Sequence, residues 1–277
     1  MGLDLKENVK IREETNLLYL GTTGWKYEHW FNGFYPTNNS DDWLKFYAER
    51  SAFSEIRYTF NKLPADELVQ TWANETPNYF IFAASMTKTT TFIPSHEVQD
   101  EEIVEFFDRL KPLKNKLTMV ILQFPKNFQN TPQTITFLES LLQSCKSKFS
   151  GNLLLDVQNR SWNKEDVNAM LIKNHASILS TDRRPIVSQM SNPDIYYLRL
   201  QGDTGLIPTK DFGKVHFPRK NDLKHWATHL KFRYKRHKKI FVAIDNHFSG
   251  NSTTDGYQLS EQLMTQQVKK FYGFRYY

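Results

Sequence analysis

The sequence predicts an α/β protein of the TIM-type (β/α)8 barrel class, folded as one domain. Eight apolar runs of strand length alternate with amphipathic runs of helical periodicity, spread evenly over about 250 residues. A chain of 277 residues is also the usual size of one such barrel. An open, doubly wound parallel sheet is the alternative that the same alternation allows.

The predicted elements follow one another without a linker or a low-complexity block. The strands are residues 16–22, 53–64, 79–85, 117–124, 152–157, 176–181, 195–200 and 239–245. The helices are 41–50, 65–75, 98–110, a helix from 131, then 163–174, 222–237 and 255–271. We expect residues 1–15 to form an N-terminal arm and 16–277 to form the barrel domain. The segment 182–194 contains Pro185 and Pro193 and little apolar sequence, so we expect an irregular barrel there.

The run 53–64 alternates apolar and polar residues with a period of two, as a strand with two different faces does. The apolar face is Ile56, Tyr58 and Phe60, and the polar face is Glu55, Arg57 and Thr59. Because helices flank this run on both sides, we expect the apolar face to pack on them and the polar face to point into the barrel. Buried charges are costly unless they are paired or serve a polar site, so the pattern predicts a polar pocket.

Composition limits the class of protein. A formal net charge of +6 favours acidic ligands but falls short of the asymmetry typical of nucleic-acid binders. The lone cysteine, Cys145, excludes an internal disulfide framework and predicts a reducing, cytoplasmic setting, with an inert thiol near a helix end. The charged residues 1–15 lack the apolar core of a signal peptide, and no run approaches 18 apolar residues, so we expect neither export nor membrane insertion.

Active sites of TIM barrels lie at the carboxyl ends of the strands, and these ends are polar here. We predict four acid or base candidates: Glu55, Asp156, Asp182 and Asp245. We predict substrate-binding candidates at Trp25, Arg57, Lys88, Gln123, Gln158, Arg183, Arg199, Gln201, Asn246 and His247. Arginines recognise phosphate or carboxylate through paired hydrogen bonds, and neighbouring carboxylates can divide acid and base roles. The alternative is a buried network of acids and arginines that neutralise one another.

We predict no cofactor. A divalent ion held by Asp245, His247 and a carboxylate across the barrel is a less favoured alternative, because the other histidines fall in predicted helices or loops. The basic run 231–239 resembles a nucleic-acid patch. It precedes the last predicted strand, however, and cations are favoured at a helix end, so a solvated surface at the opposite face of the barrel is the preferred interpretation.

Several segments resemble those of one known family. They are 21–30 (GTTGWKYEHW), 34–36 (FYP), 53–64 (FSEIRYTFNKLP), 121–125 (ILQFP), 156–162 (DVQNRSW) and 197–202 (YLRLQG). Together they resemble the YecE-like family, an uncharacterised group, over residues 20 to about 263. The resemblance implies a TIM-type barrel with a distant likeness to the endonuclease IV and xylose isomerase barrels. It implies no established reaction.

The resemblance also implies which pocket residues are shared. The residues that agree with the family pattern are Trp25, Glu55, Gln123, Trp162, Asp182, Arg199 and Asn246. The residues that depart from it are Arg57 (Asn in the family), Ser85 (Lys), Asp156 (Glu), Gln158 (Arg), Gln201 (His) and Asp245 (Asn). The departures change both charge and proton-transfer capacity, so the resemblance implies a divergent member that binds a different ligand or none.

Three functions fit these observations. The first is an enzyme, a hydrolase or isomerase, acting on a phosphorylated or sugar-containing substrate, with Glu55 and Asp156 as acid and base and Arg57 and Arg199 holding an anion. The second is a non-catalytic binding protein for a small polar metabolite. The third is nucleic-acid binding through the basic surface, which predicts strong dependence on salt.

Overall fold

The computed structural model describes residues 16–92, 95–163, 165–183, 194–268 and 270–274. The predicted arm, residues 1–15, lies outside the described residues, and so do residues 184–193 of the segment between the sixth and seventh predicted strands.

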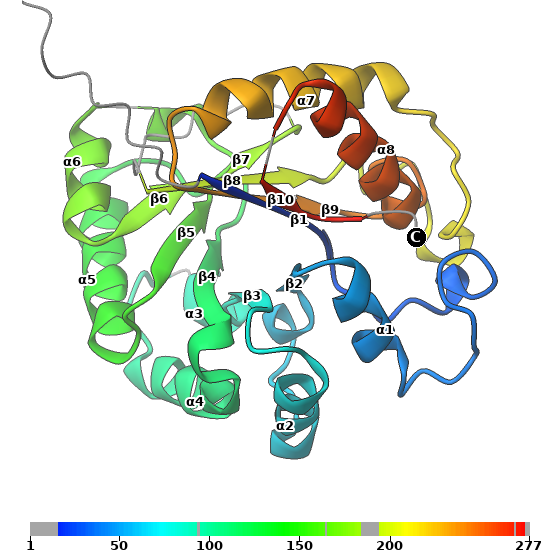
Figure 1. Ribbon diagram of the computed structural model, residues 1–277. Coiled ribbons are helices and arrows are strands. Elements are labelled where there is room, and N and C mark those ends of the chain that lie inside the picture. Colours follow the sequence, from blue (N-terminus) through cyan, green and yellow to red (C-terminus); the bar gives the residue numbers. More distant parts are fainter. Residues whose placement is uncertain (1–15, 93–94, 164, 184–193, 269, 275–277) are drawn as a thin grey trace, which may run out of the picture.

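The strands form one parallel sheet that curves into a barrel (Figure 1). They are β1 (Leu17–Thr23), β2 (Phe53–Ile56), β3 (Ile81–Ser85), β4 (Leu117–Gln123), β5 (Asn152–Asp156), β6 (Ala176–Ile178), β7 (Ser180–Thr181), β8 (Ile195–Leu200) and β9 (Lys239–Ile244). The pairing order is β6-β5-β4-β3-β2-β1-β9-β8-β7, and a short β10 (Phe271–Tyr272) pairs with β1. Strands that follow in sequence are neighbours in space, and the predicted TIM-type barrel is confirmed.

Helices connect the strands and cover the outside of the barrel (Figure 1). They are α1 (Trp43–Arg50), α2 (Asp66–Glu75), α3 (Lys88–Thr91), α4 (Asp100–Leu110), α5 (Pro132–Lys148), α6 (Glu165–Lys173), α7 (Lys220–Tyr234) and α8 (Ser252–Thr265). A short helix, α3, lies between the third predicted strand (79–85) and the next predicted helix (98–110), where the sequence predicted neither a strand nor a helix. Among the described residues, no helix is both long and apolar enough to cross a membrane.

The sixth strand of the barrel is interrupted at one residue. β6 pairs with β5 and β7 pairs with β8, while Leu179 between them donates its N–H to the carbonyl of Leu155. The two pieces are therefore parts of one extended run that joins both neighbours. β6 and β7 stand at the two ends of the pairing order, so the barrel is nearly closed, with a gap between these two pieces. The irregularity was expected over 182–194, of which residues 184–193 lie outside the described residues.

The strand expected over residues 53–64 is shorter than predicted. β2 ends at Ile56, and residues 58–60 form a turn of 3-10 helix instead of continuing the strand. The hydroxyl of Thr59 donates to the carbonyls of Ile56 and Ser85, at 3.1 and 2.6 Å, and so stabilises the turn. Tyr58, expected to pack on a helix, is 43% exposed for this reason. Arg57 consequently lies at the rim of the barrel.

Alternate residues of each strand divide the core into two layers. An inner cluster fills the barrel with residues such as Phe53, Ala83, Ile121 and Phe241, and a larger outer cluster lies between the sheet and the helices. Glu55 falls two residues after Phe53 on the inward side. The lower barrel is thus apolar, and the polar inward residues follow at the carboxyl ends of the strands.

Candidate functional site

Arg199 on β8 is the centre of a buried network inside the barrel. Its Nε and Nη2 donate to the two oxygens of Glu55 at 3.0 and 2.8 Å, and its Nη1 donates to Asp156 at 2.5 Å. The hydroxyl of Tyr197 donates to Glu55 at 2.7 Å. These residues come from β2, β5 and β8, so barrel closure brings them together.

Electrostatics favour the charged form of Arg199 and the protonated form of Tyr197. Burial lowers the pKa of Arg199, but the charges of Glu55 and Asp156 outweigh burial and raise it. Burial and the charge of Glu55 raise the pKa of Tyr197 well above its usual value. Arg199 and Glu55 are both 0% exposed, and every guanidinium nitrogen of Arg199 is used. Because its side chain is fully buried against these carboxylates, a ligand could reach this arginine only by displacing them.

A second network surrounds Asp245, directly after β9. One carboxylate oxygen of Asp245 accepts from Arg57 Nη1 and from the hydroxyl of Thr23, both at 2.8 Å. The other oxygen accepts from His247 Nδ1 at 2.6 Å and from the backbone N–H of His247 at 2.9 Å. The side chain of Arg57 is 29% exposed, and that of His247 is 17% exposed. This network therefore reaches the surface.

The Asp245 carboxylate determines which ring nitrogen of His247 carries a proton. Burial raises the pKa of Asp245, but the hydrogen bond from His247 and the charge of Arg57 outweigh burial and hold it well below its usual range. Because an ionised carboxylate only accepts hydrogen bonds, His247 must donate from Nδ1. In the neutral imidazole Nε2 then carries a free lone pair, which can accept a proton or a hydrogen bond.

A cavity of about 340 Å³ lies beside this second network. Its lining residues come from the ends of β1 and β2 and from α2: Thr23, Gly24, Trp25, Lys26, Tyr27, Ile56, Arg57, Tyr58, Leu68 and Trp72. Two cations and four aromatic rings thus line one small space. Trp25 and Trp72 meet edge to face, with ring centroids 5.4 Å apart, and form one wall.

Two other predicted residues bind neighbouring backbone or buried groups. Asp182 accepts from the backbone N–H groups of Gln201 and Gly202, at 2.6 and 3.0 Å, and burial raises its pKa even so. The carbonyl oxygen of Asn246 accepts from the indole of Trp30 at 3.1 Å and from Ser252. These contacts fix the loops after β7 and β9.

Five predicted residues have side chains that stand apart from both networks. Gln123 lies in register with Asp156 on the neighbouring strand, whereas Lys88 is exposed on α3. Within the part of the chain that the structure describes, no hydrogen bond or ion pair joins either network to the side chains of Lys88, Gln123, Gln158, Arg183 and Gln201. The prediction that they bind a ligand stays a prediction.

Sequence reasoning missed Tyr197, Lys26 and Tyr27. The signal for Tyr197 was present, because it lies two residues before Arg199 and so shares its inward face. Lys26 and Tyr27 follow β1 in an irregular loop, where no periodicity shows which way a side chain points.

No group of three or more His, Cys, Asp or Glu residues is arranged to hold a metal ion in the described ranges. The pair of Asp245 and His247 supplies two such side chains, short of the three or four protein ligands of a typical zinc site. Burial raises the pKa of the Cys145 thiol to about 12, so the expected inert thiol agrees with its surroundings.

Comparison with known proteins assigns the chain to a family. Residues 19–272 match the family model described as "Protein of unknown function DUF72". The chain belongs to the DUF72 family. The UPF0759 protein YunF of Bacillus subtilis (strain 168) is 25% identical, with 89% of this chain and 95% of that protein covered.

Two solved DUF72 structures share the fold. A DUF72 family protein (TM1631) of Thermotoga maritima MSB8 superposes with a TM-score of 0.75 at 19% identity, covering 90% of this chain and 99% of that one. A DUF72 family protein (EF0366) of Enterococcus faecalis V583 gives a TM-score of 0.70 at 16% identity, covering 94% and 98%. At these identities the likeness extends to the barrel alone.

Proposed function

We propose that this DUF72 protein is an enzyme, a hydrolase or isomerase, that binds a small phosphorylated substrate at Arg57 and Lys26 and moves a proton through His247. One observation carries the proposal. Arg57 and His247 donate to the two different oxygens of the Asp245 carboxylate, so an anion-binding group and a proton-transfer group are held side by side at the barrel mouth.

Arg57 supports the anion-binding role. One of its nitrogens is used by Asp245, while the rest of this partly exposed side chain lines the cavity of about 340 Å³ together with Lys26. Arginine favours phosphate through paired hydrogen bonds, and a cavity of this size suits a small ligand. The aromatic walls would contact the apolar faces of a sugar or ring. Arg199 is unsuited to this role because its nitrogens are occupied and buried.

His247 supports the proton-transfer role. Its Nδ1 is held by Asp245, which leaves Nε2 to act as a base toward water or a substrate hydroxyl and to return the proton afterwards. Glu55 and Asp156, the acid and base expected from the sequence, both bind Arg199 and have little or no contact with solvent. We therefore assign the proton transfer to His247 and a stabilising role to Glu55 and Asp156.

Binding can be tested with inorganic phosphate and glucose 6-phosphate by calorimetry, comparing the wild type with Arg57→Gln. Loss of a hydrogen bond to a charged group costs roughly 1.5–3 kcal/mol, so affinity should fall about 10- to 100-fold. Arg57→Lys keeps the charge and should lose less. Equal phosphate affinity in wild type and Arg57→Gln would reject this site.

Turnover can be tested with p-nitrophenyl phosphate and a panel of sugar phosphates, comparing wild type with His247→Gln. We expect turnover by the wild type and at least a 100-fold loss of kcat in the variant, the usual scale of acid–base catalysis, with phosphate affinity kept. Phosphate binding without turnover of any substrate in the panel would instead favour the non-catalytic binding protein.

A further inference from the structure

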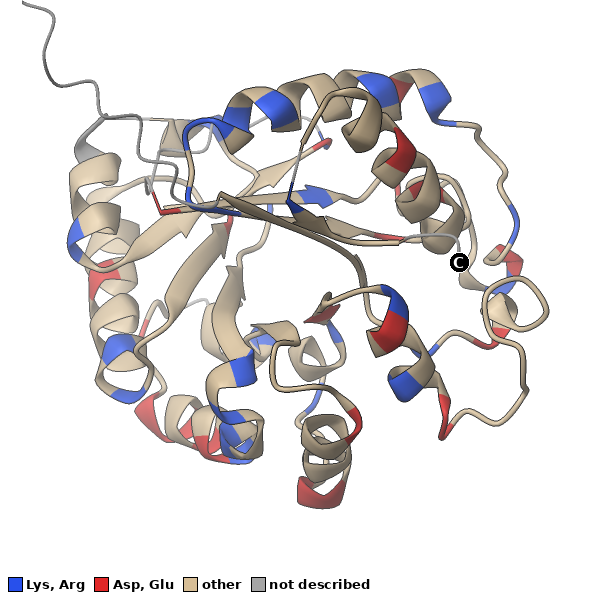
Figure 2. Cartoon of the chain, in the orientation of Figure 1, with Lys and Arg blue, Asp and Glu red and all other residues tan. Residues whose placement is uncertain are grey.

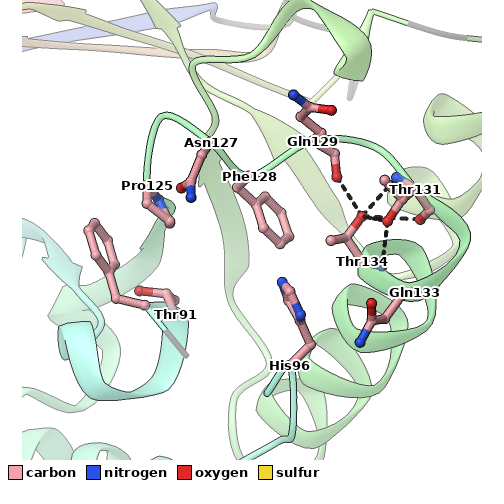
Figure 3. A pocket seen from close by; sticks show the side chains of 10 residues that line it. Thr91, His96, Pro125, Asn127, Phe128, Gln129, Thr131, Gln133 and Thr134 are labelled. Carbon is pink, nitrogen blue, oxygen red and sulfur yellow. Dashed lines mark hydrogen bonds between the residues drawn. The ribbon is translucent and has the colours of Figure 1, made fainter. Parts of the chain in front are cut away.

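A second cavity, of about 580 Å³, lies on the same face of the barrel. It is formed by the end of α3, the loop before α4, the segment after β4 and the first turn of α5 (Figure 3). Its lining residues are Thr91, Phe92, His96, Pro125, Asn127, Phe128, Gln129, Thr131, Gln133 and Thr134. It shares no lining residue with the cavity at Arg57, so a ligand bound here would be independent of the proposed function.

We propose that this cavity binds a neutral sugar. Its lining contains no lysine, arginine, aspartate or glutamate, which separates it from the cavity at Arg57. The polar groups that it does contain are three amides, three threonine hydroxyls and the imidazole of His96. Such groups both donate and accept hydrogen bonds, as sugar hydroxyls do.

The beginning of α5 argues against an anion. The N–H groups of a first helical turn commonly bind phosphate, but here they are already used. Thr131 and Thr134 bond to each other's backbone N–H groups through their hydroxyls, Pro132 has no N–H, and the N–H of Ile135 bonds to the carbonyl of Thr131. Only the N–H of Gln133 is left in this turn, which is too little for an anion site.

Two buried polar atoms in the lining lack a partner. His96 Nδ1 and the hydroxyl of Thr91 make no hydrogen bond to any part of the chain that the structure describes, although both atoms are out of contact with solvent. Leaving such a group unpaired costs roughly 1–3 kcal/mol. A small rotation of each side chain would turn its polar atom into the cavity, where a ligand hydroxyl can donate to one atom and accept from the other, so a bound sugar would recover this cost.

The remaining walls are apolar and partly rigid. The ring of Phe128 is stacked between Phe124 and Trp162, with centroids 4.2 and 5.0 Å apart, and Figure 3 shows His96 facing it. Phe92 is 41% exposed and can cover the C–H face of a sugar ring. Rings opposite amides, in a cavity with space for one or two sugar units, fit a neutral carbohydrate better than a flat apolar ligand.

The test is a titration of the whole protein with D-glucose, D-xylose, N-acetyl-D-glucosamine and maltose, followed by saturation-transfer NMR. We expect at least one sugar to bind in the millimolar range, as a small polar ligand does. Asn127→Ala and Gln133→Ala, both at exposed positions, should each weaken that sugar about tenfold. Arg57→Gln, outside this cavity, is the matched control and should leave the sugar affinity unchanged.

Thr91→Val separates binding from folding. It replaces an unpaired buried hydroxyl by a methyl group of similar shape, so the melting temperature should stay equal or rise while the sugar affinity falls. The proposal is overturned if no sugar of the panel binds. It is also overturned if sugar binding survives all three substitutions, or if inorganic phosphate competes with the sugar for this cavity.

Discussion

Two arginines in this barrel have similar partners and different surroundings. Arg199 binds two carboxylates from the inner face of β8 and is 0% exposed, whereas Arg57 binds one carboxylate at the end of β2 and is 29% exposed. A buried arginine with all nitrogens paired is a structural element, because any ligand would have to replace an existing ion pair. An arginine with one paired nitrogen at a cavity can hold a substrate. Depth along the barrel, more than residue type, separates the two roles.

The largest expected effect comes from Arg199→Met. This change leaves Glu55 and Asp156 buried without their counter-charge, so the free energy of unfolding should fall by about 3–5 kcal/mol. Arg57→Met should cost roughly 1 kcal/mol, because Asp245 keeps its bonds from Thr23 and His247. Urea unfolding of both variants measures this difference. Equal losses would remove the distinction between the two networks.

Tyr197→Phe should have an intermediate effect on stability. It deletes one hydrogen bond to the buried carboxylate of Glu55, with an expected loss of about 1.5 kcal/mol and no change in phosphate affinity. Tyr196→Phe on the outer face of the same strand, where the hydroxyl meets His229, is the matched control and should cost less. A phosphate affinity that falls in Tyr197→Phe would connect the inner network to binding.

The pH dependence should identify the rim network. The pKa of Asp245 is lowered in the folded protein, so its contribution to stability is present above the unfolded value of about 3.9 and is lost as the pH falls through the folded value. The stability difference between wild type and Asp245→Asn should therefore shrink as the pH is lowered below about 4. A difference that stays constant from pH 7 to pH 2.5 would contradict the lowered pKa.

The smallest effect is expected for Lys88→Ala. Lys88 is exposed on α3 and pairs with neither network in the described structure, so stability should change by less than about 0.5 kcal/mol. Phosphate affinity should also stay the same. A clear loss of phosphate affinity, measured by the same calorimetry as for Arg57→Gln, would restore the sequence-based prediction that Lys88 binds substrate.

The order of the elements could be predicted well from the sequence, because alternation of period two and amphipathic periodicity are local signals. The same alternation placed Glu55 on the inward side of β2. It could not show that the strand ends at Ile56, since the turn depends on a bond from Thr59 to the carbonyl of Ser85 in the next strand. Arg57 is partly exposed because β2 ends one residue before it, so its exposure could not be predicted from the sequence either.

The ion-pair partners of the buried charged residues were harder to predict than the positions of these residues in the barrel. The carboxylates and arginines expected near the barrel mouth do lie there, but which arginine neutralises which carboxylate depends on distances across the barrel. For the basic run 231–239, in contrast, the position in the fold could be predicted from the sequence. Its place at the end of α7 and the start of β9 follows from the order of elements alone, and Figure 2 shows the lysines and arginines spaced along α7.

The interruption at Leu179 leaves the sixth strand of the barrel with few backbone pairs to its neighbours, β5 and β8. Three residue pairs join β5 to β6 and two join β7 to β8, as few as the two between β1 and β2, against six between β8 and β9. A barrel opens most readily where few backbone pairs join neighbouring strands, so backbone amides beside Leu179 should exchange with deuterium before those of β9, which has six pairs on each side. The ion pair between Arg199 on β8 and Asp156 on β5 links the two strands on either side of this interruption, so it would hold the barrel mouth together where backbone pairing is short.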